Sequence, residues 1–275
     1  MNIEHLQNNV NIIVKRNRKS TMKNLLNGTN ESFYWIGFLL ADGAFYKNYR
    51  VRLVLSKKDM AHLYKYAEYI ESDVKVYTFQ EYDYAYVASM DKLYVSMLMD
   101  RFDIHPNKTY HPPNIEVFKH LSFEENMSMI CGFIDGDGCI KHQYNRPDSS
   151  MMIKLHHTWK VFLQYILDFI NINFHKTKSK ITITKCSRYA YLVISDNDIL
   201  NRIKNFAILK ELPIMTRKWD NIQYYETRTS KALYKRNKIL DYIKIHPYIS
   251  VKKISDELEI PYSTVYSILK RLDRC

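Results

Sequence analysis

The sequence has few cysteines, few glycines and prolines, and no long apolar run. Its four cysteines form no Cys-x-x-Cys pair, which argues against a zinc site or a disulfide framework, and we expect reduced thiols at Cys131, Cys139, Cys186 and Cys275. Six glycines and seven prolines argue against a long disordered stretch. The apolar runs 33–41 and 129–134 are far shorter than the roughly 20 residues that span a bilayer, and the polar N-terminus lacks a signal-peptide core. We therefore expect a soluble intracellular protein, with an organelle matrix, a bacterial cytoplasm and a phage-infected cytoplasm equally compatible.

Acidic residues are also in short supply. The 29 Asp and Glu residues face 41 Lys and Arg, which gives a net charge of +12 and a pI near 9.3. Such a charge favours polyanionic partners through steering and counterion release, so nucleic acid is the first candidate, and a basic surface without a partner is the alternative. The hydrophobic fraction of 46% is typical of a folded protein, and 275 residues allow one large domain or two to three smaller ones.

Two segments of the chain repeat the same order of features. Each contains Gly-Phe-x-x-x-Asp-Gly at the end of an apolar stretch, at 37–43 and at 132–138. A hairpin pattern, a helical periodicity, a strand pair with the triplet Tyr-Ala-Tyr and a third helix after Asp91 or Asp196 follow in both. The predicted ranges are 44–46 with 51–55, 60–70, 74–79 with 84–87 and a helix to Phe102, then 139–143 with 151–155, 160–170, 180–184 with 189–192 and a helix to Phe206. The expected fold class is α+β, with two pseudo-symmetric αββαββα halves.

The glycine in the middle of each motif helix predicts how the halves pack. Gly37 and Gly132 each cost about 1 kcal/mol relative to alanine in a helix, so a close approach of the two helix backbones is the expected compensation. Packed about a pseudo-twofold axis, the helices would bring Asp42 and Asp137 together at one end. The glycines that follow the aspartates, at 43 and 138, are expected to end the helices in the left-handed conformation.

Paired aspartates at two helix C-termini predict a metal site. The negative end of each helix dipole and the mutual repulsion both disfavour the charged carboxylates, and a hard divalent cation would relieve both costs. Such a site on a basic protein suits phosphodiester hydrolysis. The alternative is that Asp-Gly only caps a helix and begins a hairpin, but two copies at equivalent positions make that interpretation less attractive.

The paired motifs, from about residue 33 to residue 222, resemble those of single-chain LAGLIDADG homing endonucleases. The resemblance implies a monomer whose two sheets form a saddle in the DNA major groove, with Mg²⁺ or Mn²⁺ held by the last acid of each motif. Transferred to this sequence, these acids are Asp42 and Asp137, and the carbonyls of Ala41 and Gly136 are further ligands. The earlier acid of the motif is present as Asp135 but is replaced by Leu40 in the first half.

The same resemblance implies catalytic helpers. A polar residue at the end of the second strand corresponds to Lys57 and His157, and a lysine in the loop after the third helix corresponds to Lys108 and Lys218. A solvated loop lysine or a strand-end histidine without a catalytic part is the plain alternative for each.

Residues that alternate along the strands, counted from the metal acid, are expected to read bases, while Val51, Leu53 and Leu55 face inward. The candidates are Tyr46, Asn48, Arg50, Arg52, Lys141, Gln143, Asn145 and Lys154, with Lys75, Tyr77, Lys180, Thr182 and Arg188 from the second strand pairs. An ordinary solvated sheet face is the alternative.

Beyond residue 222 the chain predicts three helices, at 232–245, 251–258 and 262–272, which resemble a helix-turn-helix. Its core would contain Ile254, Leu258, Val265, Ile268 and Leu269, and its groove-facing residues would be Tyr262, Ser263, Thr264, Tyr266, Ser267 and Lys270. Any three-helix bundle could show a similar pattern. The predicted division is a basic arm at 1–30, half one at 31–118, half two at 119–222, and a basic linker with the all-α tail at 223–275.

The sequence therefore predicts a site-specific DNA endonuclease that makes a metal-dependent double-strand break in double-stranded DNA, as in the homing of a mobile intron or a free-standing gene. Two alternatives stay open. One is a transcription regulator that binds DNA without cleaving it, because one bacterial regulator family joins a LAGLIDADG-like domain to a helix-turn-helix. That family tends to lose the metal acids, which are kept here. The other is an intron RNA maturase that uses the same saddle on structured RNA.

Overall fold

The computed structural model describes residues 22–70, 76–78, 82–142, 149–222, 228–246 and 249–272. The chain forms two compact units, Met1–Ile222 and Gln223–Cys275. Residues 1–21 of the predicted arm lie outside the described residues. Among the described residues, no helix combines the length and apolar character needed to cross a membrane.

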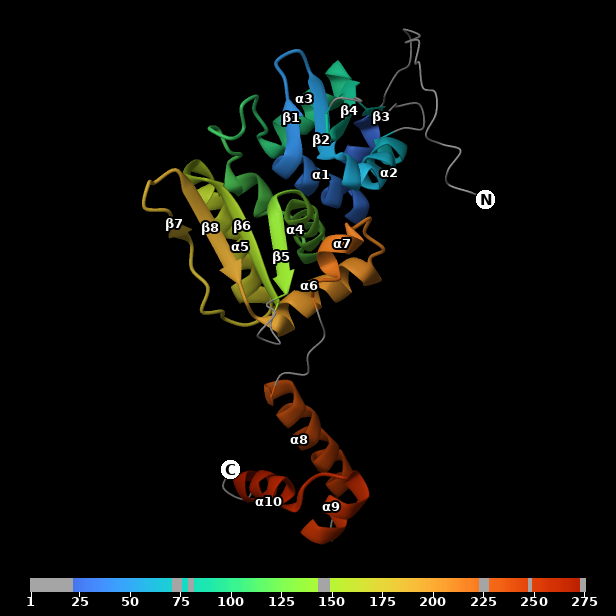
Figure 1. The fold of residues 1–275 in the computed structure, drawn as a ribbon, viewed down its shortest axis with the longest axis vertical. Helices are drawn as coiled ribbons and strands as arrows, with labels where there is room; N and C mark the ends of the chain where they lie inside the picture. Colours follow the sequence, from blue (N-terminus) through green and yellow to red (C-terminus); the bar gives the residue numbers. More distant parts are fainter. Residues whose placement is uncertain are drawn as a thin grey trace, which may run out of the picture. The chain divides into compact units, whose positions relative to one another are not determined.

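The first unit contains the two predicted halves (Figure 1). Half one consists of η2 (Met22–Leu26), α1 (Asn30–Asp42), β1 (Gly43–Phe45), β2 (Arg50–Ser56), η3 (Lys57–Asp59), α2 (Met60–Ile70), β3 (Val76–Thr78), β4 (Tyr84–Met90) and α3 (Lys92–Phe102). Half two, with its connection, consists of η4 (Ile115–Phe118), α4 (Phe123–Asp137), β5 (Gly138–His142), β6 (Ser149–His156), η5 (His157–Trp159), α5 (Lys160–Asn173), β7 (Thr182–Ile183), β8 (Tyr189–Ile194), α6 (Asn197–Leu209) and α7 (Thr216–Trp219). The order αββαββα is confirmed in both.

Each half folds its four strands into one antiparallel sheet, with the orders β1-β2-β4-β3 and β5-β6-β8-β7. The alternation of side chains is as predicted, since Val51, Leu53 and Leu55 are 1%, 0% and 7% exposed. The matching pairs Leu53↔Val87 and Ile153↔Leu192 lie on the inner faces of the two sheets. Each sheet therefore packs one face on the helices and leaves the other face for a partner.

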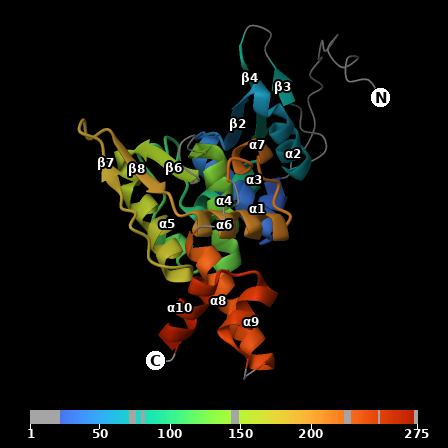
Figure 2. The same cartoon turned by 60° about the horizontal axis from the view of Figure 1, so that its bottom comes forward.

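The two motif helices, α1 and α4, lie side by side between the sheets (Figures 1 and 2). A Cβ on Gly37 would lie 1.9 Å from the carbonyl oxygen of Met129, and a Cβ on Gly132 would lie 1.8 Å from that of Tyr34. No other residue type permits this approach of the two backbones, so the predicted helix interface at Gly37 and Gly132 is confirmed.

The predicted conformation of the glycines after the motif aspartates is wrong. Gly43 has φ −72° and ψ 139°, and Gly138 has φ −79° and ψ 145°, which is extended backbone. Each chain passes directly from its helix into a strand instead of reversing through a left-handed cap. A Cβ at either position would meet the helix carbonyl four residues earlier, at 2.5 Å from Leu39 O and 2.4 Å from Ile134 O, so close packing is what requires glycine here.

The second unit is a small bundle of three helices, α8 (Arg228–Ile245), α9 (Val251–Leu258) and α10 (Tyr262–Leu272). Their buried core consists of Ile239, Ile254, Ile260 and Val265, with Leu258, Ile268 and Leu269 partly buried around it. Both ends of α9 and both ends of α10 are as predicted. Helix α8 begins four residues before the predicted start at residue 232.

Candidate active site

Asp42 and Asp137 are the last residues of the paired helices α1 and α4, and both are half-buried. Burial raises the pKa of Asp42 to about 6, the charge of Asp137 adds to this rise, and Lys218 and Lys108 oppose it. Burial also raises the pKa of Asp137, again against Lys108 and Lys218. The fold therefore brings two acids and two lysines, predicted separately along the sequence, to one place.

Lys108 is held against the end of α1. Its Nζ donates to the carbonyl oxygen of Ala41 at 2.6 Å, and its own carbonyl accepts a hydrogen bond from Trp159 Nε1 at 3.1 Å. Burial lowers the pKa of the Lys108 ammonium, while the nearby charges of Asp137 and Asp42 raise it. A loop lysine with this many constraints is not an ordinary solvated cation.

Lys218, in α7, occupies the equivalent place at the end of α4. Its Nζ donates to the carbonyl oxygens of Gly136 at 3.0 Å and Gly138 at 2.9 Å, and also to that of Asp135. Burial lowers its pKa as well. Although its sequence context matched the loop less closely than that of Lys108, the structure gives it more hydrogen bonds.

Asp135, the earlier motif acid, is a buried structural anchor. Its carboxylate, 1% exposed, accepts hydrogen bonds from Tyr34 Oη at 2.7 Å, Trp219 Nε1 at 2.7 Å and Met215 N at 2.9 Å. Burial raises the pKa of Asp135 to about 6, and these three donors counteract the rise. The carboxylate thus connects α1 to the segment that carries Lys218. No equivalent network is possible in half one, where Leu40 takes this position.

Each lysine segment is fixed by a residue of the opposite half. Arg217, next to Lys218, forms a two-point ion pair with the buried carboxylate of Asp59 in half one. On the other side, Thr158 of half two donates to the carbonyl of Thr109, next to Lys108, at 2.6 Å. These contacts join residues up to 158 positions apart, and no local sequence pattern indicated them.

Lys57 and His157 begin the equivalent short helices η3 and η5 that follow the second strand of each half. The predicted equivalence of their positions is confirmed. Among the described residues, neither side chain forms a hydrogen bond or ion pair with Asp42 or Asp137. Their catalytic part stays a prediction.

The oxygen atoms at the helix ends suit a hard divalent cation. The carbonyls of Ala41 and Gly136 already accept hydrogen bonds from ammonium groups, which shows that both are aimed at positive charge. A carbonyl oxygen has two lone pairs and can serve a second cationic partner. In the described part of the chain no group of three His, Cys, Asp or Glu side chains is arranged to hold a metal ion, so a cation at the helix ends would rely on the two carboxylates and main-chain oxygen.

The predicted DNA-facing residues that the structure describes lie on the outer sheet faces and in the adjoining loops. Exposed are Tyr46, Asn48, Arg50, Lys141, Lys154, Lys180 and Arg188, and half-buried are Arg52, Tyr77 and Thr182. Lys75, Gln143 and Asn145 lie outside the described residues. The Arg52 guanidinium lies 4.1 Å from the ring centre of Tyr86, and Lys154 Nζ lies 4.6 Å from that of Tyr189, so tyrosines from the Tyr-Ala-Tyr triplets help to orient cations on both faces.

No family model and no curated protein matches the chain. Several solved structures do. The LAGLIDADG homing endonuclease I-LtrWI bound to target DNA is 13% identical, with 87% of this chain and 97% of that chain covered and a TM-score of 0.47. The LAGLIDADG meganuclease I-CpaMI bound to uncleaved DNA is 14% identical, with 83% and 97% covered and a TM-score of 0.43. I-SmaMI bound to an uncleaved DNA target with calcium ions is 11% identical, with 82% and 96% covered and a TM-score of 0.46.

Two of these three structures are named as LAGLIDADG proteins, the family whose motif the repeated Gly-Phe-x-x-x-Asp-Gly of this chain resembles. The duplicated Gly-Phe-x-x-x-Asp-Gly motif accounts for the meeting of Asp42 and Asp137, whereas the anchors Asp59, Trp159 and Arg217 were not predicted.

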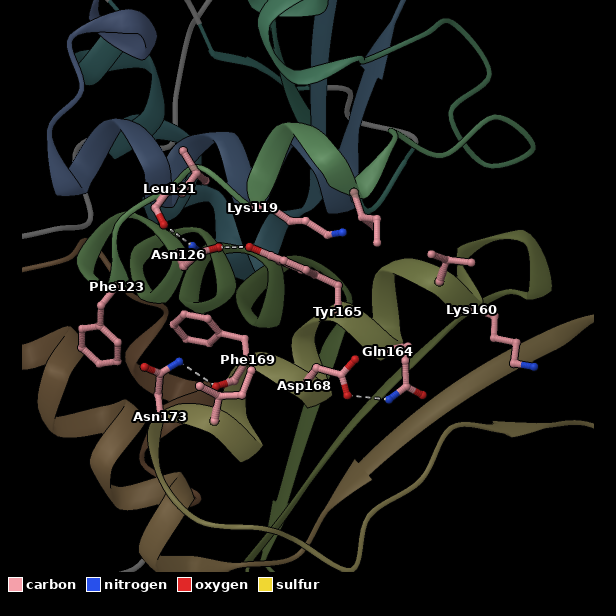
Figure 3. A pocket seen from close by; sticks show the side chains of 13 residues that line it. Lys119, Leu121, Phe123, Asn126, Lys160, Gln164, Tyr165, Asp168, Phe169 and Asn173 are labelled. Carbon is pink, nitrogen blue, oxygen red and sulfur yellow. Dashed lines mark hydrogen bonds between the residues drawn. The ribbon is translucent and has the colours of Figure 1, made fainter.

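A cavity of about 880 Å³ lies away from this site (Figure 3). It is lined by η4, the first turn of α4 and the outer side of α5, including Phe123, Tyr165 and Phe169. Because Asp137 ends α4, the length of that helix, about 20 Å, separates the cavity from the acids. A smaller pocket of about 400 Å³ adjoins the site, lined by β1 and by the loop that carries Lys108.

The buried position of His62 predicts that the free energy of unfolding decreases in acid. Its Nε2 lies 3.0 Å from Tyr34 Oη, which in turn donates to Asp135, and burial together with nearby cations lowers the His62 pKa to about 3. The unfolded state then binds more protons between pH 6.5 and 3, so the stability from neutral His62 is present above pH 6.5 and is lost as the pH falls.

Urea unfolding at pH 7 and pH 5 checks this prediction. Between these values the free energy of unfolding of the wild type should fall by roughly 2 kcal/mol more than that of His62→Gln, since one pKa unit corresponds to about 1.4 kcal/mol. The exposed His157 provides the control: between pH 7 and pH 5, His157→Gln should lose as much free energy of unfolding as the wild type. Equal slopes for wild type and His62→Gln would contradict the assignment.

Proposed function

We propose that the chain is a site-specific DNA endonuclease of the LAGLIDADG homing type, acting inside a cell as a monomer with internal pseudosymmetry. The observation that carries the proposal is the meeting of Asp42 and Asp137, from equivalent helix ends, with the half-buried Lys108 and Lys218. Partial burial of two carboxylates and two ammonium groups lowers the free energy of unfolding, and such a destabilising arrangement is typical of a functional site. DNA is the substrate that the net charge of +12 and the cationic sheet faces favour.

Mg²⁺ or Mn²⁺ would be held by Asp42, Asp137 and the carbonyls of Ala41 and Gly136. When bound, such an ion activates water and stabilises the charge on the scissile phosphate. The residue types fit this cation because oxygen is the only donor that they offer. The two carboxylates also orient water by accepting its hydrogen bonds.

The two lysines act on the phosphate and on the leaving oxygen. Carbonyl oxygens hold each ammonium beside the helix ends: Lys108 keeps N–H groups for the phosphate, whereas Lys218 would exchange one of its carbonyl hydrogen bonds for one to the phosphate. Burial lowers the pKa of both lysines, which makes the release of a proton to the leaving oxygen easier than from a solvated lysine. Lys57 and His157 are retained as candidates for orienting the attacking water from the ends of the second strands.

The bases are read by the outer sheet faces. Side chains that alternate along β2 and β6, such as Arg50, Arg52 and Lys154, point away from the helices and would contact base edges in the major groove. Because the halves are not identical in these residues, the preferred target is a long site with unlike half-sites.

A transcription regulator that only binds DNA would not require the paired acids and lysines. A maturase would use the same faces on structured RNA. The experiment incubates the protein with a random duplex DNA library and Mg²⁺ or Mn²⁺, then sequences the ends. We expect cleavage of both strands at one defined site and none in EDTA. Specific binding without cleavage in any divalent metal would support the regulator, and preferential binding of intron RNA would support the maturase.

A further inference from the structure

The second unit contains a rigid turn between two helices. Helix α9 ends at Leu258 and is capped by Glu259, whose φ of 54° places it in the left-handed region and whose N–H donates to the carbonyl of Ser255. Ser255 Oγ donates to Ile260 O at 2.8 Å, and Ile260 N donates to Ser255 O at 3.1 Å. Pro261 then supplies the carbonyl that accepts the first hydrogen bonds of α10. Three residues between two short helices are the length of a helix-turn-helix connection.

One side of α10 is used for the core, which defines the side that faces outward. Val265 is 0% exposed and packs with Ile254 of α9 and Ile239 of α8, while Ile268 and Leu269 are partly buried beside it. The buried side of α10 is therefore fixed by contacts with both other helices. The opposite side is free of contacts with the core.

The outward side of α10 carries two tyrosines, two serines and a lysine. Tyr262 and Tyr266 are 54% and 50% exposed, and their rings are stacked with centroids 6.4 Å apart. Lys270 Nζ lies 5.9 Å from the Tyr266 ring, so the three side chains form a continuous stripe at the spacing of one helical turn. Ser263 and Ser267 are exposed beside it, and α10 contains no acidic residue.

Basic residues lie where a neighbouring phosphate would be contacted. Lys252 and Lys253 are exposed in the first turn of α9. The acid Glu257, near the end of α9, accepts a hydrogen bond from Tyr242 Oη and lies 3.9 Å from Lys253 Nζ. In residues 223–275 there are eleven Lys and Arg against six Asp and Glu. The hydroxyls, aromatic rings and lysine on the outward side of α10, together with the lysines of α9, favour a polyanion over an apolar protein surface.

We propose that this unit is a second DNA-binding site, in which α10 lies in the major groove of duplex DNA and the start of α9 contacts the phosphates. The major groove of B-DNA, about 12 Å wide, admits a helix, whereas the deep narrow groove of A-form RNA does not. The inference rests on the proposed function only for the choice of DNA as the probe. Tethering this unit to the first would raise affinity for targets that extend beyond the segment covered by the two sheets.

The test uses the full chain and a duplex target selected by it, in EDTA so that no strand is cut. Ser263→Glu places a negative charge on the outward side, and a glutamate in the first turn is favourable for the helix itself. Ile245→Glu at the end of α8 makes the same charge change at a residue that is 72% exposed and outside the stripe. The dissociation constant is measured by fluorescence anisotropy, and the contacted length by footprinting.

We expect Ser263→Glu to weaken binding at least about tenfold and to shorten the footprint, with Ile245→Glu within twofold of wild type. Lys270→Gln should lower the slope of log K against log salt by about one. An unchanged affinity and footprint for Ser263→Glu, an equal loss in Ile245→Glu, or stronger competition by structured RNA than by duplex DNA would overturn the inference. A chain that binds through α10 but never cuts DNA would support it and contradict the endonuclease function.

Discussion

Asp42→Asn and Asp137→Asn are each expected to lower the rate of double-strand cleavage by at least about 1000-fold, without loss of DNA binding. Asparagine keeps the shape of the side chain but lacks the negative charge that holds a divalent cation. Because burial raises the pKa of both acids and so favours their neutral form, the neutral amide should not lower the free energy of unfolding at either position. Removing a negative charge close to phosphates should leave affinity unchanged or increase it.

A supercoiled plasmid that contains the selected target measures this effect, because nicked and linear products report one and two broken strands. Asp100→Asn, at an exposed position in α3, is the matched control and should cut as the wild type does. Since the charge of Asp137 raises the pKa of Asp42, the acids share one environment, and both strands should be affected in each variant. Nicking at the wild-type rate in either variant would contradict a shared site.

The elements of the fold were accessible from the sequence where local chemistry decides them. Helix α2 has the predicted bounds Met60–Ile70, and Asp91 accepts the hydrogen bond from Tyr94 N that a capping aspartate predicts. Strand alternation at Val51, Leu53 and Leu55 fixed the inward face. These signals depend on residues at most four apart, so they are visible in the sequence before any contact is known.

The failures have a common physical origin. Gly43 and Gly138 were assigned the conformation of a reversing cap, but whether a helix turns back or continues into a strand depends on where the sheet lies. Likewise, the sequence identified Asp135 only as the earlier acid of the motif and gave no structural role for it. Its donors Tyr34, Met215 and Trp219 lie 80 to 101 positions away and meet it only in the folded chain.

The candidate site shows the same division. Asp42 and Asp137 followed from the repeat itself, because symmetry predicts that equivalent helix ends meet. Lys108 and Lys218 followed only from the resemblance to a family, since neither has a distinctive local pattern. The contacts that hold them, from Trp159 and through the Asp59–Arg217 pair, cross between the halves. The alignment of the candidate site residues in each half therefore depends on correct packing of α1 against α4.

Gly37→Ala and Gly132→Ala test that dependence. Each is expected to lower the free energy of unfolding by at least about 3 kcal/mol, because the added Cβ would lie within 2 Å of a backbone oxygen that no rotamer change can move. Helix propensity alone predicts the opposite sign, since alanine stabilises a helix by about 1 kcal/mol relative to glycine. The exposed Ala61 in α2 calibrates propensity, and Ala61→Gly should cost about 1 kcal/mol.

Urea unfolding of the purified variants measures the difference, and the yield of folded protein gives a lower bound where a variant does not fold. Gly136→Ala is an informative comparison, because its Cβ would lie 2.3 Å from the Cβ of Ala41, a side-chain atom. Combining Gly136→Ala with Ala41→Gly should therefore recover stability, whereas no side-chain truncation should rescue Gly37→Ala. If Gly37→Ala were as stable as the wild type, the backbone contact between the motif helices would not be what joins the two halves.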